Sequence, residues 1–185
     1  MKNKLPNVIG LSGLAGAGKS TLACLLIAEH GYKLIKFADP LKAMLRGYYE
    51  NLGLSDHAIQ LRIEGSLKEV PDADLGGKTP RYAMQTLGTE WGRALIGQHL
   101  WTNAAETKLQ NALACGQRVV FDDLRFENEA AVIRRNGGTV VRIERTGVAL
   151  SDSAHASELG VKADVVIVND GEPEAMLEQL CAFAT

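Results

Sequence analysis

Cysteine, long apolar runs and net charge are all scarce in this 185-residue sequence. Its three cysteines, Cys24, Cys115 and Cys181, are far apart and form no Cys-x-x-Cys pair. That spacing argues against a disulfide framework or a zinc site, and it favours a reducing, cytoplasmic setting. No apolar run is long enough to span a membrane. The formal net charge of -2 gives no standing attraction to nucleic acid. We therefore expect neither a membrane nor a nucleic acid as partner.

The order of the apolar segments predicts the fold class. Short apolar runs typical of buried strands lie at 7–12, 32–37, 118–122, 139–144 and 165–169, and helical patterns alternate with them. This alternation predicts an α/β fold with a five-stranded parallel sheet covered on both faces, as a three-layer α/β/α domain. The length suits a single domain, and ligands of such sheets bind at the carboxyl ends of the strands.

The middle of the chain reads as mostly helical, over residues 40–115. Pro40 can begin one helix, and Thr79-Pro80 restarts another with Thr79 as its cap. Gly97 marks a break within the helical stretch. The segment 52–78 holds a cluster of Pro, Asp and Gly residues and is expected to be a loop-rich, mobile insertion.

The strongest motif is the run from Gly13 to Ser20, GLAGAGKS, which satisfies the pattern G-x-x-x-x-G-K-[ST] between a buried strand and an amphipathic helix. Glycines let backbone N–H groups approach phosphate oxygens, and the helix N-terminus adds a partial positive charge. Lys19 is expected to reach the β- and γ-phosphates of ATP, and Ser20 to ligate Mg²⁺. The expected nucleotide-binding residues are Gly13, Ala15, Gly16, Ala17, Gly18, Lys19, Ser20 and Thr21. The alternative is a glycine-rich turn with a surface lysine.

This loop alone does not separate kinases from GTPases or motor ATPases. A GTPase would need a guanine-reading Asn/Thr-Lys-x-Asp after a late strand, and the sequence from Val168 to Gly171 does not match it. Asp122-Asp123, at the end of a predicted strand, can supply a carboxylate on the Mg²⁺ side. The alternative is that this acidic pair only caps the next helix. We favour Asp122 as a metal-binding and catalytic residue.

Several segments together resemble a known family, the phage-type deoxynucleoside monophosphate kinases. They are the glycine-rich loop, Phe37–Lys42, Thr79–Arg93, Asp122–Glu129, His155–Glu158 and Ile167–Asp170, in this order along most of the chain. The resemblance implies a P-loop kinase that transfers the γ-phosphoryl group of ATP to a deoxynucleoside 5′-monophosphate. It also implies a helical acceptor-binding region over about 40–115 and a lid over about 145–162, and it adds Lys42 to the acceptor-binding residues.

Arginines supply the charge that such a transfer needs, because their planar fork binds phosphate bidentately. Arg125 directly follows the strand that ends at Asp122, and we expect it to act on the phosphates. Arg81 and Arg93 are candidates for the acceptor phosphate, and Arg145 adjoins the expected lid and is a candidate for the nucleotide. Each of these arginines can also be a solvated surface charge.

The remaining candidates concern the acceptor and the adenine of ATP. Asp39 follows the second strand and is a catalytic candidate that can orient the acceptor or carry part of the water shell of Mg²⁺; its alternative role is a helix N-cap. Gln85 and Glu90 can read an acceptor base through hydrogen bonds, and Trp91 can stack on it or be buried in the helix. Asn169 ends the last strand, where adenine can lie.

Two other functions fit the same sequence. One is a related small-molecule kinase, such as a dephospho-coenzyme A or phosphomevalonate kinase, which differs only in its acceptor pocket. The other is an ATP-dependent switch or assembly protein with no acceptor. The sequence does not reveal the accepted bases or whether the protein forms a homodimer.

Overall fold

The computed structural model describes residues 5–147 and 161–183. The chain forms two compact units. The first, here called the sheet unit, contains Met1–Phe37 and Ala105–Thr185, and the second, the helical unit, contains Ala38–Ala104. Each unit is described by itself below.

The sheet unit is built on five parallel strands, in the order β2-β3-β1-β4-β5 within the described residues. The strands are β1 (Val8–Ser12), β2 (Tyr32–Leu34), β3 (Arg118–Phe121), β4 (Thr139–Glu144) and β5 (Val165–Val168). The helices are α1 (Lys19–His30), α5 (Leu100–Ala114), whose first turn belongs to the helical unit, α6 (Glu127–Arg135) and α7 (Pro173–Phe183). This arrangement confirms the predicted α/β class and the five-stranded parallel sheet.

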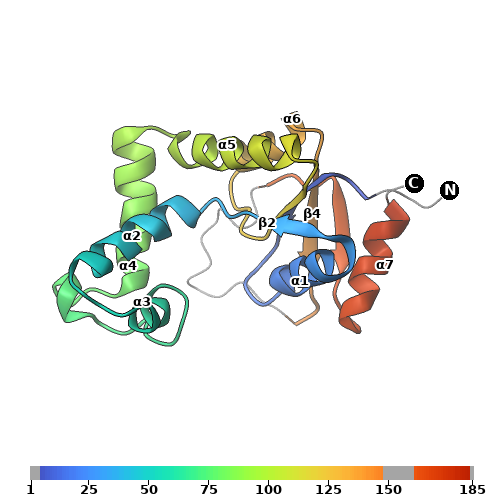
Figure 1. Ribbon diagram of the computed structural model, residues 1–185. Helices are drawn as coiled ribbons and strands as arrows, with labels where there is room; N and C mark the ends of the chain where they lie inside the picture. The colour runs from blue at the N-terminus through green and yellow to red at the C-terminus, as the bar shows by residue number, and fades with distance from the viewer. Residues whose placement is uncertain (1–4, 148–160, 184–185) are drawn as a thin grey trace. The chain divides into compact units, whose positions relative to one another are not determined.

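Helices cover both faces of this sheet, which gives the predicted three layers (Figure 1). On one face, Ile9, Val120 and Val141 pack with Leu22 of α1 and Leu180 of α7. On the other face, Val8, Val119 and Val140, each one position before the strand residues just named, pack with Leu109 of α5 and Ile133 of α6. The central strands β1, β3 and β4 are largely buried on both faces and read as nearly continuous apolar runs, which is why the sequence located them well. The edge strands β2 and β5 have exposed side chains.

The position of β1 determines where a ligand can bind. β1 lies between β3 and β4 at the centre of the sheet, and the chain passes from β1 to one side of it before it returns to the other. In open parallel sheets, ligands bind at such a reversal, outside the carboxyl ends of the strands. The residues that follow these ends are Gly13, Ile35, Asp122, Arg145 and Asn169.

The helical unit contains α2 (Asp39–Asn51), α3 (Asp56–Ile63), the short 3-10 turn η1 (Ala73–Leu75), α4 (Pro80–Thr86) and the π-helix η2 (Leu87–Ile96). It has a core of its own, made of Leu45, Tyr49, Ile59, Ile63 and Met84. Thr79 caps α4 as predicted, because its hydroxyl accepts the Tyr82 N–H at 3.1 Å. The predicted break at Gly97 is also confirmed.

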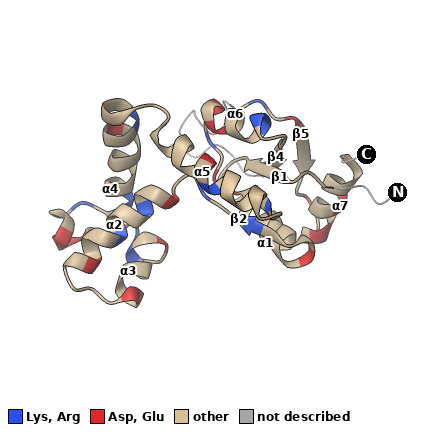
Figure 2. Ribbon diagram, turned by 45° about the horizontal axis from the view of Figure 1, so that its top comes forward, with Lys and Arg blue, Asp and Glu red and all other residues tan. Residues whose placement is uncertain are grey.

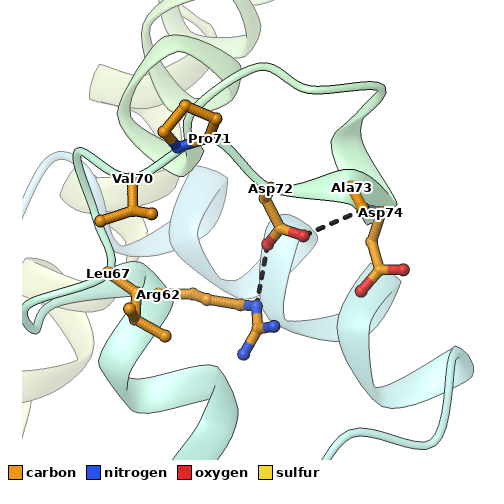
Figure 3. Close-up of a pocket in the computed structure, with 7 residues that line it drawn as sticks. All are labelled: Arg62, Leu67, Val70, Pro71, Asp72, Ala73 and Asp74. Carbon is orange, nitrogen blue, oxygen red and sulfur yellow. Dashed lines mark hydrogen bonds and ion pairs between the residues drawn. The ribbon is translucent and has the colours of Figure 1, made fainter.

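Outside α3 and η1, the segment 52–78 is rich in turns, as expected, but the sequence did not predict these two helices or the buried carboxylate that attaches the segment. Asp72 accepts hydrogen bonds from the Tyr49 hydroxyl (2.8 Å), Arg62 Nε (2.8 Å) and the Asp74 N–H (3.0 Å). Figure 3 shows the bonds from Arg62 and Asp74 beside a hollow of about 310 Å³. Burial opposes ionisation of Asp72, but these hydrogen bonds outweigh it and lower the pKa of its carboxyl.

Other differences from the sequence prediction are local. The strand β2 ends at Leu34, and the next residue, Ile35, still donates its N–H to Val120 at 3.0 Å. The N-cap of α2 is Ala38 rather than Asp39, which is the first helical residue. Most of the expected lid, residues 148–160 with His155, lies outside the described residues. Among the helices that the structure describes, none has the length and apolar character needed to cross a membrane.

Candidate active site

The glycine-rich loop has positive φ angles at Gly13, Gly16 and Gly18, and two of these glycines are also closely packed. Gly13 has φ 134°, and a Cβ there would lie 2.4 Å from the carbonyl oxygen of Ile143 on β4. Gly18 has φ 111°, and its Cβ would lie 2.5 Å from Nδ2 of Asn169. Both approaches are too close for any side chain, so the loop rests directly on the sheet behind it. The other predicted loop residues, Ala15, Gly16 and Thr21, are exposed, whereas Ala17 is buried.

Lys19, the first residue of α1, folds back over the loop. Its ammonium group donates to the carbonyl oxygens of Gly13 at 2.6 Å and Leu14 at 2.8 Å. The carbonyls thus hold a positive charge at the helix N-terminus, where backbone N–H groups also favour an anion. Such surroundings suit the negative charge of a phosphate chain.

Two predicted nucleotide contacts from the other strands meet the loop. The Asn169 amide donates to the carbonyl oxygen of Ala17 at 2.8 Å. Arg145, which is exposed, has Nη1 3.5 Å from the carbonyl oxygen of Gly16. Asn169 therefore supports the conformation of the loop, a contact that the sequence did not indicate, and Arg145 lies where it can face phosphates bound there.

Asp122 and Ser20 lie in contact beside the glycine-rich loop. The Ser20 hydroxyl is 3.2 Å from Oδ2 of Asp122, whose side chain is only 5% exposed. Oδ2 is also 3.3 Å from the ammonium group of Lys36, whereas Oδ1 is buried and has no hydrogen-bond partner among the described residues. An unsatisfied buried carboxylate oxygen beside a hydroxyl suits Mg²⁺ or a water bound to it, because Mg²⁺ takes oxygen ligands and keeps several waters.

The structure also distinguishes Asp122 from its neighbour. Asp123 accepts the backbone N–H of Phe37 through Oδ1 at 3.0 Å. It therefore joins β3 to the segment after β2 and has a structural role. The described residues contain no cluster of three or more His, Cys, Asp or Glu side chains that could hold a metal. Ser20 and Asp122 suit an ion that is held mainly by waters and phosphates.

Arg125 lies in the loop between β3 and α6, and its side chain is exposed. The loop around it is held by Glu129, whose carboxylate accepts the N–H groups of Arg125 at 2.8 Å and Phe126 at 3.1 Å. Glu129 is itself 3% exposed. Sequence reasoning missed this support, although a Glu three residues after a helix start is a known signal for it.

Three cations gather in the helical unit. Lys42 of α2 forms an ion pair with Glu64 at 2.6 Å, and Arg81 of α4 forms one with Glu69. The backbone N–H of Arg81 donates to the carbonyl oxygen of Lys68 at 3.0 Å. Figure 2 shows basic and acidic residues interspersed along the helices of this unit.

Lys68 was missed by sequence reasoning because it lies in the segment that was read as a loop. Burial lowers the pKa of Lys68, and the charges of Arg81 and Lys42 lower it further. A cation in such surroundings gains from an added anion. Lys42, Arg81 and Lys68 are therefore the described residues of the helical unit best suited to a phosphate.

Of the three residues predicted to contact an acceptor base, two line a hollow in the helical unit and one does not. Glu90 and Trp91 of η2 line an open apolar hollow of about 540 Å³, together with side chains of α2 and α4 that include Met44, Tyr48 and Ala83. Gln85 is exposed and does not line it. Arg93 is half-buried on η2, and Asp39 is half-buried at the start of α2.

Trp101 is core, as the sequence predicted, and is 4% exposed. Its indole N–H donates to the carbonyl oxygen of Gly88 at 2.7 Å. The ring leaves no room for a side chain on Gly92, where a Cβ would lie 2.3 Å from it. Trp91 is 37% exposed, with its ring centroid 6.1 Å from that of Trp101, so it has an accessible face.

The glycine-rich loop between a buried strand and a helix, at the carboxyl end of a five-stranded parallel sheet, defines a P-loop kinase fold. Comparison with known proteins agrees. The model of the deoxynucleotide monophosphate kinase family matches residues 78–180. A protein of Acanthamoeba polyphaga mimivirus, provisionally assigned as a deoxynucleotide monophosphate kinase, is 36% identical over 191 residues, which cover 94% of this chain and 93% of that protein.

The chain belongs to the deoxynucleotide monophosphate kinase family. Membership makes the protein a nucleotide kinase and confirms the resemblance that its sequence indicated. Among solved structures, TT1252 from Thermus thermophilus has the same fold, with a TM-score of 0.53 and 21% identity over 97% of each chain.

Proposed function

We propose that this kinase transfers the γ-phosphoryl group of ATP to the 5′-phosphate of a deoxynucleoside monophosphate, with Mg²⁺ bound at Ser20 and Asp122. The observation that carries the donor half is the contact of Ser20 with Asp122, which has one buried oxygen without a partner beside the loop of Lys19. An acceptor phosphate oxygen forms a bond to the γ-phosphorus, and the bond between that phosphorus and the β,γ-bridging oxygen breaks. ADP and a deoxynucleoside diphosphate result.

The loop residues bind and orient the donor. Backbone N–H groups from Gly13 to Thr21 surround the phosphates, and Lys19 exchanges its bonds to two loop carbonyls for bonds to phosphate oxygens. Asn169 keeps the loop in shape through Ala17. Magnesium, when bound, would neutralise phosphate charge; Ser20 and Asp122 would hold it.

Arginines complete the charge compensation that phosphoryl transfer needs. Arg145 lies next to the loop at Gly16, and we assign it to the donor phosphates. Arg125 is exposed in a loop fixed by Glu129, and we assign it to the charge that builds up during transfer. Asp39 and Arg93 remain proposals for orienting the acceptor.

The helical unit is the proposed acceptor-binding region. Lys42, Arg81 and Lys68 would hold the acceptor phosphate. The phosphate would replace Glu64 as the partner of Lys42 and Glu69 as the partner of Arg81. The apolar hollow with Glu90 and Trp91 would take the base, since stacking and one polar edge suit a nucleobase. Gln85 lies outside that hollow and would act only at its rim.

ADP formation tests this function. Release of ADP should require ATP, Mg²⁺ and a deoxynucleoside monophosphate together, and EDTA should abolish it. ATP hydrolysis that no acceptor stimulates would overturn the proposal and favour an ATP-dependent switch. We place the reaction in the cytoplasm because three cysteines without a pairing pattern suit a reducing compartment.

A further inference from the structure

Lys36 lies beside the donor site. It follows β2, and its ammonium group is 3.3 Å from Oδ2 of Asp122. The same oxygen is 3.2 Å from the Ser20 hydroxyl. Because the two contacts share one atom, the ammonium group lies within two hydrogen-bond lengths of the hydroxyl proposed to face the metal.

This ion pair is unlike one on the protein surface. Exposed pairs contribute little, since water solvates both partners. Here the Asp122 side chain is 5% exposed and that of Lys36 is 28% exposed. A carboxylate this buried needs a counter-ion, and yet its other oxygen, Oδ1, has no partner. The pair therefore neutralises the charge of Asp122 but leaves the hydrogen-bonding capacity of Oδ1 unused, so that this oxygen can bind a further ligand.

A second lysine of the same segment provides a comparison. Lys33, within β2, is exposed, and its ammonium group is 3.4 Å from the side-chain oxygen of Gln117. Lys33 and Lys36 thus differ in environment: one faces a neutral amide in solvent, and the other faces a buried carboxylate next to Ser20. Only Lys36 is placed to act on a ligand of the donor site.

We propose that Lys36 is a resident cation of the donor site, which neutralises Asp122, supports the nucleotide phosphates and moderates the binding of Mg²⁺. The inference rests on the proposed donor site. Loss of one positive charge at this position weakens the binding of an anion and strengthens the binding of a dication. The two effects have opposite signs, which a general loosening of the fold would not produce.

The test is calorimetry of ADP binding to the whole protein, with Lys36→Met and with Lys33→Met as the matched control. In EDTA, Lys36→Met should bind ADP roughly tenfold more weakly, because a cation near the phosphates is lost. With ADP present, the Mg²⁺ concentration for half-saturation should fall several-fold. Lys33→Met should match the wild type in both measurements.

Lys36→Arg, which keeps the charge, should restore both values to near wild type. Lys36→Gln serves as a second uncharged variant if Lys36→Met does not fold, and circular dichroism identifies that case. Unchanged affinities in the uncharged variants, or two shifts in the same direction, would overturn the proposal. These measurements need no acceptor, so a failure of the deoxynucleotide assay would leave their result intact.

Discussion

Replacement of Asp122 by Asn should lower the turnover number strongly and change the free energy of unfolding little. The variant keeps the size of the side chain but removes its charge. Three contributions to the free energy of unfolding change. The Ser20 contact falls from a charged to a neutral hydrogen bond, which costs about 1 kcal/mol. The ion pair with Lys36 contributes about 1 kcal/mol, the upper end of the range for exposed pairs, because Asp122 is buried while Lys36 is still partly screened by water. Relief of the charged, unpartnered Oδ1 returns about 1–3 kcal/mol.

These terms nearly offset, so the free energy of unfolding should change by no more than about 1–2 kcal/mol in either direction. The turnover number should fall by about 100-fold or more, because the site loses the carboxylate proposed to hold the metal. Urea unfolding gives the first quantity, and a coupled assay of ADP release gives the second.

Asp123→Asn is the matched control. Its remaining carbonyl oxygen can still accept the Phe37 N–H, and Asp123 is not assigned to the metal, so the turnover number should stay near wild type. If Asp122→Asn kept wild-type turnover, Asp122 would be only a structural residue. A loss of several kcal/mol in Asp122→Asn would show that the carboxylate stabilises the fold, against the reasoning above.

Two further predictions concern Lys19 and Asp72. Lys19→Met should lower the turnover number about 100-fold or more in a folded protein, because the phosphates lose their cation at the loop; near-normal activity by coupled assay would refute that role. Asp72→Asn should lower stability by about 1–3 kcal/mol at pH 7. Since the folded pKa of Asp72 is lowered, this difference is present above the unfolded value and should vanish as the pH falls through the folded value. Urea unfolding over a series of pH values from 7 downward measures it, and a difference that does not shrink as the pH falls below the unfolded value would contradict the assignment.

The sequence predicted the sheet unit well because its signals are local. The strands are mostly apolar in sequence, and glycines such as Gly31 and Gly116 end the helices that precede strands. The glycine-rich loop is also recognisable from eight consecutive residues, although its support by Asn169 is not. The Asp122–Lys36 contact joins residues 86 positions apart in the sequence, and only the pairing of β2 with β3 brings them to the same edge.

The helical unit was harder to predict because long-range contacts determine it. Pro, Gly and Asp in 52–78 indicate turns, but Asp72 fixes that segment through Tyr49 and Arg62, which are distant in sequence. The π-helix η2 also gave no signal, since its i+5 bond from Gly97 to Gly92 does not change the apolar pattern strongly. The prediction of the acceptor site missed Lys68 because that residue lies in the segment 52–78, which long-range contacts fix.

The central claim is the phosphorylation of deoxynucleoside monophosphates, and kcat/KM across acceptors tests it most directly. The acceptors are dTMP, dGMP, dCMP, dAMP and their ribose counterparts, with dephospho-coenzyme A and phosphomevalonate as controls. We predict a preference of roughly tenfold or more for deoxyribose, because a 2′-hydroxyl buried without a partner costs about 1–3 kcal/mol. Equal use of ribose and deoxyribose would contradict the proposed sugar discrimination. Activity confined to a control acceptor would contradict the claim itself.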